Sequence, residues 1–130
     1  INSFSFKFFE SILLMSVKII IAEDELIIAK ANATMLTKLG YEVEVVKNAA
    51  DVISAVKTFN PALILMDIHF RKDQATGIDA AIEIRKNNNV PIIFTSGNKP
   101  DSIGEISNVE HLTKPVNINL LKQKIIEYTS

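Results

Sequence analysis

Acidic side chains follow two short apolar stretches of this sequence. Asp67 ends the run 62–66, and Glu23 and Asp24 follow the β-branched run 17–22. Unbroken apolar runs of this length are typical of strands buried on both faces of a parallel sheet, and ligands of open α/β sheets bind beyond the carboxyl ends of the strands. The pattern predicts an acidic site at one edge of a sheet. Taken singly, each group also fits a structural role, because an aspartate can begin a turn and acids favour a helix N-terminus.

Two further polar side chains follow later apolar runs. Ser96 comes after 90–95, and Lys114 comes after 109–113. Carboxylates such as those above, together with water, are the ligands that Mg²⁺ prefers, and an aspartate can accept a phosphoryl group as an acyl phosphate. Phosphoryl transfer depends on positioning and charge neutralisation, which Mg²⁺, the Lys114 ammonium and the Ser96 hydroxyl would supply. The set therefore predicts Mg²⁺-dependent phosphoryl transfer to Asp67.

The elements that would hold these side chains alternate along the chain. Strand and helix patterns follow one another five times between residues 17 and 130. Such alternation is typical of a doubly wound α/β domain, with a parallel sheet, right-handed crossovers and helices on both faces. The predicted strands span 17–22, 41–46, 61–67, 90–95 and 109–113, and the predicted helices span 26–39, 49–59, 78–85, a short stretch within 99–107, and 119–128.

Helix ends and faces are also visible in the sequence. Gly40 predicts the end of the first helix, and Asn48 is a favourable N-cap for the second. In the last helix the apolar spacing predicts an inward face. That face would carry Leu120, Leu121, Ile125 and Ile126.

The composition is that of an ordinary globular domain. The 130 residues are enough for one domain with its own core, and 48% are hydrophobic and 22% charged. A net charge of −1 argues against direct nucleic-acid or membrane-surface binding. The chain has no cysteine, and no apolar stretch approaches the roughly 18 residues that span a bilayer. We therefore expect a cytoplasmic domain that has no membrane partner.

Residues 1–16 are interpreted as an N-terminal extension of a domain that spans 17–130. The extension is rich in phenylalanine but is interrupted by Lys7 and Glu10. It lacks the basic start, long apolar core and cleavage site of a secretory signal. We interpret it as a linker remnant, translated upstream sequence or a partner-binding segment.

Residues 17–130 closely resemble the receiver domain of response regulators in two-component signalling, the CheY-like family. The matching motifs lie at 19–25, 63–68, 77–81, 91–97 and 113–115. The resemblance implies a flavodoxin-like (βα)5 three-layer sandwich with a parallel sheet of strand order 2-1-3-4-5. It also implies a phosphoprotein that catalyses its own Mg²⁺-dependent phosphorylation and dephosphorylation, rather than an enzyme in the usual sense.

The same resemblance assigns roles to the acidic residues. It implies that Asp67 is the phosphoacceptor, and that Asp24 and Asp67 bind Mg²⁺ directly, with Mn²⁺ as an alternative ion. Glu23 would act on the metal through water. The backbone carbonyl of His69 would complete the site.

The resemblance further implies a conformational switch. Lys114 takes the lysine position of the family, and the spacing after Pro91 selects Ser96, rather than Thr95, as the hydroxyl that moves toward the phosphoryl group. The aromatic position that follows this movement is occupied by His111. Because imidazole titrates near neutrality, we hypothesise that the switch is sensitive to pH. The alternative for His111 is an exposed or half-buried histidine on an edge strand.

The implied partners are a histidine kinase or a histidine phosphotransfer protein as phosphodonor, and a downstream effector protein or domain. We expect a monomer or a weak dimer, whether stand-alone or part of a longer regulator or hybrid kinase. Two features depart from the family. The loop after Asp67 is longer than usual and contains His69, Arg71 and Lys72 in place of the common proline. The stretch 96–114 is short, so the fourth helix and its usual output surface are expected to differ.

Three other protein classes share parts of this pattern. A dehalogenase-type phosphatase needs a second aspartate two residues after the first, where this chain has His69. A nucleotide- or flavin-binding module needs a glycine-rich first loop, whereas the loop here begins with Glu23 and Asp24. The main alternative is a receiver-like protein-interaction module without phosphotransfer turnover.

Overall fold

A computed structural model describes residues 17–130, so the predicted N-terminal extension, 1–16, lies outside the described residues. The described part contains five strands, four α-helices and one 3₁₀ helix. In chain order they are β1 (Lys18–Ala22), α2 (Leu26–Lys38), β2 (Glu42–Val46), α3 (Ala49–Phe59), β3 (Leu63–Asp67), α4 (Gly77–Arg85), β4 (Ile92–Ser96), η1 (Asp101–Glu105), β5 (Val109–Thr113) and α5 (Ile118–Thr129). The predicted elements are therefore present, with ends shifted by a few residues.

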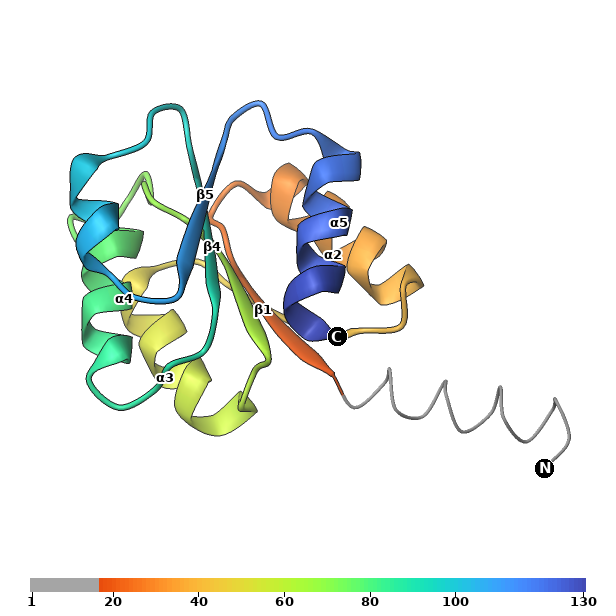
Figure 1. Cartoon of the computed structure of the whole chain (residues 1–130), viewed down its shortest axis with the longest axis horizontal. Coiled ribbons are helices and arrows are strands. Elements are labelled where there is room, and N and C mark those ends of the chain that lie inside the picture. The colour runs from red at the N-terminus through yellow and green to blue at the C-terminus, as the bar shows by residue number, and fades with distance from the viewer. Residues whose placement is uncertain (1–16) are drawn as a thin grey trace, which may run out of the picture.

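The strands form one parallel sheet in the order β2-β1-β3-β4-β5 (Figure 1). This order confirms the doubly wound, flavodoxin-like architecture. Strands β3 and β4 are buried along their whole length, because apolar side chains occupy both of their faces. The edge strands β2 and β5 are partly exposed.

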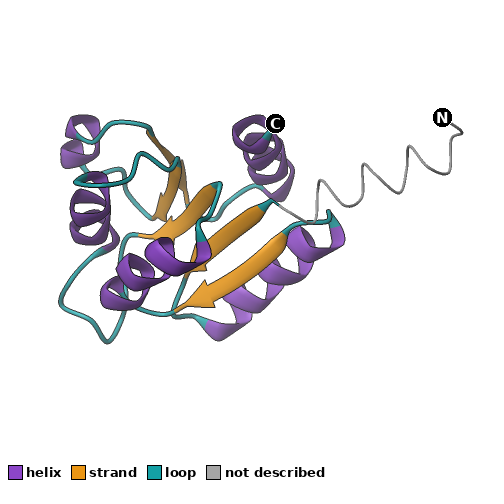
Figure 2. Cartoon of the chain, turned by 90° about the horizontal axis from the view of Figure 1, so that it is seen from below, coloured by secondary structure: helices purple, strands orange, loops and turns teal. Residues whose placement is uncertain are grey.

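Helices cover both faces of the sheet (Figures 1 and 2). On one face, α3 and α4 pack against a core that includes Ile20, Ile64 and Phe94. On the other face, α2 and α5 pack against a core that includes Ile21 and Leu65. Successive residues of a strand point to opposite faces, so the central strands contribute to both cores. Because every strand is parallel, all of the carboxyl ends lie at one edge.

Local signals explain where the helices begin and end. The Asn48 side chain accepts a hydrogen bond from the Asp51 N–H at the start of α3, as predicted. Helix α4 begins with a reciprocal capping box between Thr76 and Asp79. Gly40 follows α2 with a φ of 101°, a conformation that glycine adopts at little cost.

One predicted helix face is only partly correct. Leu121 and Ile125 are buried under the sheet, whereas Leu120 is 40% exposed and Ile126 is 49% exposed. The inward face of α5 is therefore narrower than predicted, because residues four apart share one stripe while their neighbours turn outward. None of the helices within 17–130 is long and apolar enough to cross a membrane.

The connection between β4 and β5 contains the short η1 helix in place of an α-helix. Arg85, at the end of α4, forms hydrogen bonds with the backbone of this connection. Its guanidinium donates hydrogen bonds to the carbonyl oxygens of Ser107 and Asn108 at 2.8 and 3.0 Å. The predicted shortage of space for a fourth helix is thus confirmed.

Candidate functional site

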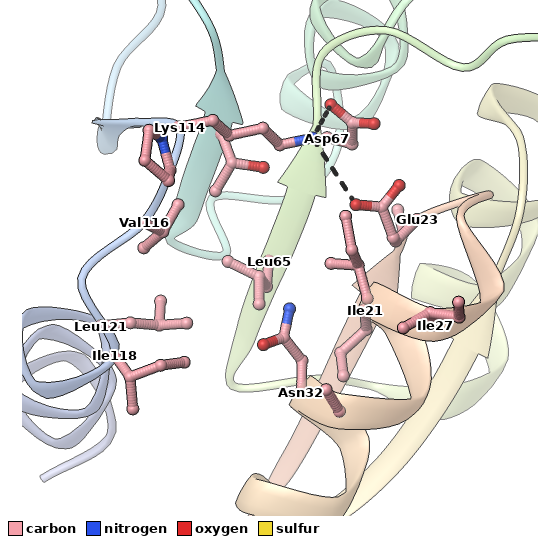
Figure 3. Close-up of a pocket in the computed structure, with 15 residues that line it drawn as sticks. Ile21, Glu23, Ile27, Asn32, Leu65, Asp67, Lys114, Val116, Ile118 and Leu121 are labelled. Carbon is pink, nitrogen blue, oxygen red and sulfur yellow. Dashed lines mark hydrogen bonds and ion pairs between the residues drawn. The ribbon is translucent and has the colours of Figure 1, made fainter.

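The carboxyl edge of the central strands brings together Glu23, Asp24, Asp67 and Lys114. Figure 3 shows three of them, Glu23, Asp67 and Lys114. The register of β1 and β3 pairs Ala22 with Met66, so the next residues of the two segments, Glu23 and Asp67, lie side by side. Lys114 follows β5, and its N–H donates to the Ser96 carbonyl oxygen at 2.8 Å. Residues far apart in the sequence thus form one cluster, as the strand-end pattern predicts.

The lysine ammonium bridges two of the carboxylates. Lys114 Nζ lies 3.2 Å from Asp67 Oδ1 and 3.6 Å from Glu23 Oε1. Glu23 and Asp67 are buried, while the Lys114 side chain is 31% exposed. Water screens such an arrangement less than a surface ion pair. The site therefore combines concentrated negative charge with a single lysine positioned to contact incoming oxygen atoms.

Glu23 shows the electrostatic consequence of this crowding. Burial is the main cause that raises its pKa, from 4.5 to about 7, and the nearby Asp67 carboxylate raises it further. A hydrogen bond from the Glu25 N–H and the charge of Lys114 act in the opposite direction but do not cancel these effects. The Glu23 carboxyl therefore keeps its proton up to near-neutral pH.

The donor set fits a hard divalent cation. Glu23, Asp24 and Asp67 each offer a carboxylate oxygen, and these three oxygens lie within 4.8 Å of one another. All are oxygen donors on short side chains, and Mg²⁺ binds to one or two carboxylates while retaining water. The His69 carbonyl remains a predicted ligand. The backbone nitrogen of His69 lies 3.4 Å from Asp67 Oδ1, so the backbone of His69 is next to the cluster.

The long loop after β3 contacts the cluster from one side. The Arg71 N–H donates to Asp24 Oδ2 at 2.6 Å, and its guanidinium pairs with Glu25. Asp73, further along the loop, accepts a hydrogen bond from the Ala49 N–H at 3.0 Å. Residue types alone do not reveal the Arg71 contact, because the backbone makes it.

The predicted switch residues are joined by a hydrogen bond. Ser96 is buried, and its Oγ lies 2.7 Å from His111 Nε2. The same hydroxyl donates to the Asn98 carbonyl oxygen. Because a hydroxyl has one hydrogen to donate, His111 Nε2 carries the hydrogen in this pair. Burial and the nearby Lys99 charge lower the pKa of His111.

Thr95 is placed differently from Ser96. It lines the cavity that also reaches Asp67, and β4 pairs Thr95 with Asp67 in the sheet register. Ser96 is instead engaged with His111 and Asn98. A hydrogen bond from Ser96 to a group on Asp67 therefore requires the Ser96 hydroxyl to turn.

Gly77 packs against the backbone of Asp67, and no role was assigned to it from the sequence. A Cβ atom at this position would lie 2.3 Å from the Asp67 carbonyl oxygen and 2.8 Å from Met66 Cγ. The Gly77 N–H also donates to the Ile68 carbonyl oxygen at 2.7 Å. The start of α4 thus packs directly on the backbone that presents Asp67. The glycine within the motif 77–81 was the signal that could have indicated this contact.

A largely apolar cavity of about 600 Å³ opens between α2 and α5 and reaches the acidic cluster (Figure 3). Ile27, which is 84% exposed, and Ile118, which is 49% exposed, stand at its sides. Leu65 and Leu121 line its interior. The site is therefore polar on the side of Lys114 and apolar on the side of the helices.

The sequence is similar to bacterial regulatory proteins. PdtaR, a transcriptional regulatory protein of Mycobacterium tuberculosis, is 34% identical over 110 residues, which cover 78% of this chain and 51% of that protein. The response regulator protein GraR of Staphylococcus saprophyticus is 28% identical over 111 residues, which cover 82% of this chain and 49% of GraR. The chain thus spans about half the length of the curated relatives it matches.

The fold has close counterparts among solved structures. The receiver domain of the Francisella response regulator 1452 superposes with a TM-score of 0.77 at 24% identity, covering 87% of this chain and 96% of that one. The family model described as the response regulator receiver domain matches residues 19–126. The chain therefore belongs to the family of response regulator receiver domains.

Proposed function

We propose that this domain accepts a phosphoryl group on Asp67 from the phosphohistidine of a histidine kinase or a histidine phosphotransfer protein. The observation that carries the proposal is the placement of the Asp67 carboxylate, which is buried beside two other acids and lies 3.2 Å from Lys114 Nζ. This combination provides a nucleophile, cation ligands and a positive charge for phosphoryl oxygens.

The transfer requires no group beyond the phosphodonor and the cation. A carboxylate oxygen of Asp67 attacks the phosphorus atom in line, and an O–P bond forms as the P–N bond of phosphohistidine breaks. Glu23, Asp24 and Asp67 would hold Mg²⁺, with the His69 carbonyl as a further ligand, and the ion would supply positive charge to the phosphoryl oxygens. Lys114 neutralises another oxygen. Dephosphorylation is attack of water on phosphorus, which releases phosphate and restores the carboxylate.

The signal would begin at Ser96. In the structure its hydroxyl is bound to His111 and Asn98. A phosphoryl group on Asp67 offers strong acceptor oxygens, so the hydroxyl gains a charge-assisted hydrogen bond by turning toward it. His111 then loses its partner and changes its environment on β5. A downstream effector would recognise this altered surface.

The apolar cavity supports a protein as the phosphodonor. It opens beside Asp67, and exposed Ile27 and Ile118 flank it. A donor that buries these side chains gains apolar contact area while it aligns its phosphohistidine with Asp67. We therefore propose the surface between α2 and α5 as the donor-binding surface.

A receiver-like interaction module without phosphotransfer is the second candidate. The surface between α2 and α5 would serve it equally well, because exposed apolar side chains favour any protein partner. The two candidates differ in what they predict for Asp67, since only phosphotransfer requires its carboxylate to react.

The test is incubation with Mg²⁺ and acetyl phosphate, followed by intact mass measurement. We expect the wild-type protein to gain one phosphoryl group, and we expect no gain in Asp67→Asn or after prior addition of EDTA. An unmodified wild-type protein that still binds Mg²⁺ and does not accept phosphate from histidine donors would favour the interaction module.

A further inference from the structure

The loop between β3 and α4 makes a backbone contact to the cation cluster. The Arg71 N–H donates to Asp24 Oδ2 at 2.6 Å, although the two residues are 47 positions apart. Asp24 is half-buried and is one of the three acids that offer oxygens to a cation. A single main-chain hydrogen thus occupies one carboxylate oxygen of a proposed metal ligand.

The loop is anchored on both sides of this contact. Before Arg71, Phe70 is 4% exposed and belongs to the core under α3 and α4. After it, Asp73 accepts hydrogen bonds from the N–H groups of Ala49 and Ala75 at 3.0 and 3.1 Å. The Arg71 N–H is therefore held in place by packing and by hydrogen bonds that do not involve the acidic cluster.

The side chain of Arg71 contributes differently from its backbone. Its guanidinium pairs with Glu25, but the Arg71 side chain is 71% exposed and that of Glu25 is 39% exposed. Exposed ion pairs contribute little, because water screens them and two long side chains lose freedom. The main-chain hydrogen bond instead fixes the orientation of a carboxylate, and partners of this kind commonly change metal affinity by about 10- to 100-fold.

We propose that Arg71 is a positioning residue for the cation, acting through its main-chain N–H on Asp24. The hydrogen bond limits the rotation of the Asp24 carboxylate, which offers an oxygen to the same cluster as Glu23 and Asp67. The inference rests on the proposed function only in taking Asp24 as a metal ligand. A proline at position 71 could not act in this way, because it has no N–H.

The test compares Arg71→Pro with Arg71→Ala by calorimetric titration of Mg²⁺ alone. Arg71→Ala keeps the N–H and removes the guanidinium, so we expect Mg²⁺ affinity close to that of the wild type. Arg71→Pro removes the N–H, and we expect affinity about 10-fold lower or more. At saturating Mg²⁺, phosphorylation of Arg71→Pro by acetyl phosphate should approach the wild-type rate. Equal Mg²⁺ affinity in the two folded variants would overturn the proposal.

A measurement on the wild-type protein covers the case in which Arg71→Pro does not fold. Amide hydrogen exchange followed by NMR should show Arg71 protected, although its side chain is exposed, and its amide resonance should shift on Mg²⁺ addition. Exchange at the rate of an unprotected loop amide would overturn the proposal. If all folded variants bind Mg²⁺ as expected but none accepts phosphate, the proposed function fails and the Arg71 inference stands.

Discussion

Burial of Glu23 beside Asp67 makes the metal-free domain sensitive to pH. The folded pKa of Glu23 is about 7, compared with 4.5 for the unfolded chain. Between these values the folded protein holds a proton that the unfolded chain has lost. The free energy of unfolding therefore falls as pH rises from about 4.5 to about 7. Above that range the Glu23 contribution is constant.

We predict that Glu23→Gln removes this part of the pH dependence. The glutamine side chain does not titrate in this range, so the free energy of unfolding should fall less between pH 5 and pH 8 in the variant than in the wild type. The difference should be at most a few kcal/mol, since one pKa unit corresponds to roughly 1.4 kcal/mol. Urea unfolding in metal-free buffer at both pH values measures the difference. Parallel pH profiles for the two proteins would contradict the assigned pKa.

The pair of Ser96 and His111 gives a second residue-scale prediction. His111→Phe keeps an aromatic ring but removes the hydrogen bond to Ser96, which is worth about 1 kcal/mol. We expect acetyl phosphate to phosphorylate the variant up to about fivefold faster, since the Ser96 hydroxyl turns more easily. Ser96→Ala should be slower than the wild type, and Thr95→Val should change less than Ser96→Ala.

The hydrogen bond between Ser96 and His111 also determines the direction in which pH should change the phosphorylation rate. A protonated His111 donates a stronger, charge-assisted hydrogen bond, so acid should retard wild-type phosphorylation relative to His111→Phe. Because burial and Lys99 lower the pKa of His111, the difference should appear only below its ordinary value of 6.5. Identical pH profiles for wild type and variant would exclude a pH-sensitive switch at His111.

At the scale of elements, the start of α4 determines where β3 presents Asp67. A methyl group at position 77 would lie 2.3 Å from the Asp67 carbonyl oxygen, so either the helix or the strand end must move. We predict that Gly77→Ala lowers the free energy of unfolding by about 1–3 kcal/mol, the usual cost of overpacking, and slows phosphorylation by acetyl phosphate.

Gly104→Ala is the matched control for this prediction. It also adds one methyl group, but a Cβ at Gly104 would have no heavy atom within 4 Å apart from Gly104 itself, its two neighbours in the chain and the backbone of its own short helix. Urea unfolding and the phosphorylation rate should both remain near wild type. If Gly77→Ala behaved like the control, close packing of α4 on the Asp67 backbone would not matter for the site.

Elements with regular patterns could be predicted from the sequence, and elements decided by tertiary contacts could not. The runs that became β1, β3 and β4 are apolar on both faces, which only a central strand requires. Leu120 and Ile126 point outward because of the way α5 meets the sheet. The apolar spacing therefore predicted more buried residues on α5 than the structure has.

The candidate site divides in the same way. Charged residues at the carboxyl ends of predicted strands indicated Glu23, Asp67 and Lys114, because parallel strands bring these ends to one edge. The Arg71 contact to Asp24 uses a backbone N–H, which every residue except proline possesses. The Gly77 contact depends on a close approach between helix and strand. Neither the Arg71 contact nor the Gly77 contact depends on the chemical type of a side chain, so residue types did not indicate them.

At the scale of the whole molecule, the surface between α2 and α5 is where we expect the phosphodonor protein to bind. Ile27→Asp should reduce phosphotransfer from a histidine kinase that phosphorylates the wild type, by about 10-fold or more if Ile27 is a central contact. Phosphorylation by acetyl phosphate should be unchanged, because this small donor does not need to bind the surface between α2 and α5. The control is Ile126→Asp, which adds the same charge to α5 outside the cavity. Equal loss in both variants would place the donor elsewhere.

The most direct test of the central claim locates the phosphoryl group. The protein is phosphorylated with acetyl phosphate and Mg²⁺ and reduced with borohydride, which converts an aspartyl phosphate to homoserine, and its peptides are sequenced by mass spectrometry. We predict homoserine at position 67 and at no other aspartate, and none when Mg²⁺ is withheld. Homoserine at another position, or an unmodified Asp67 in a protein that has gained phosphate, would contradict the assignment of Asp67 as the phosphoacceptor.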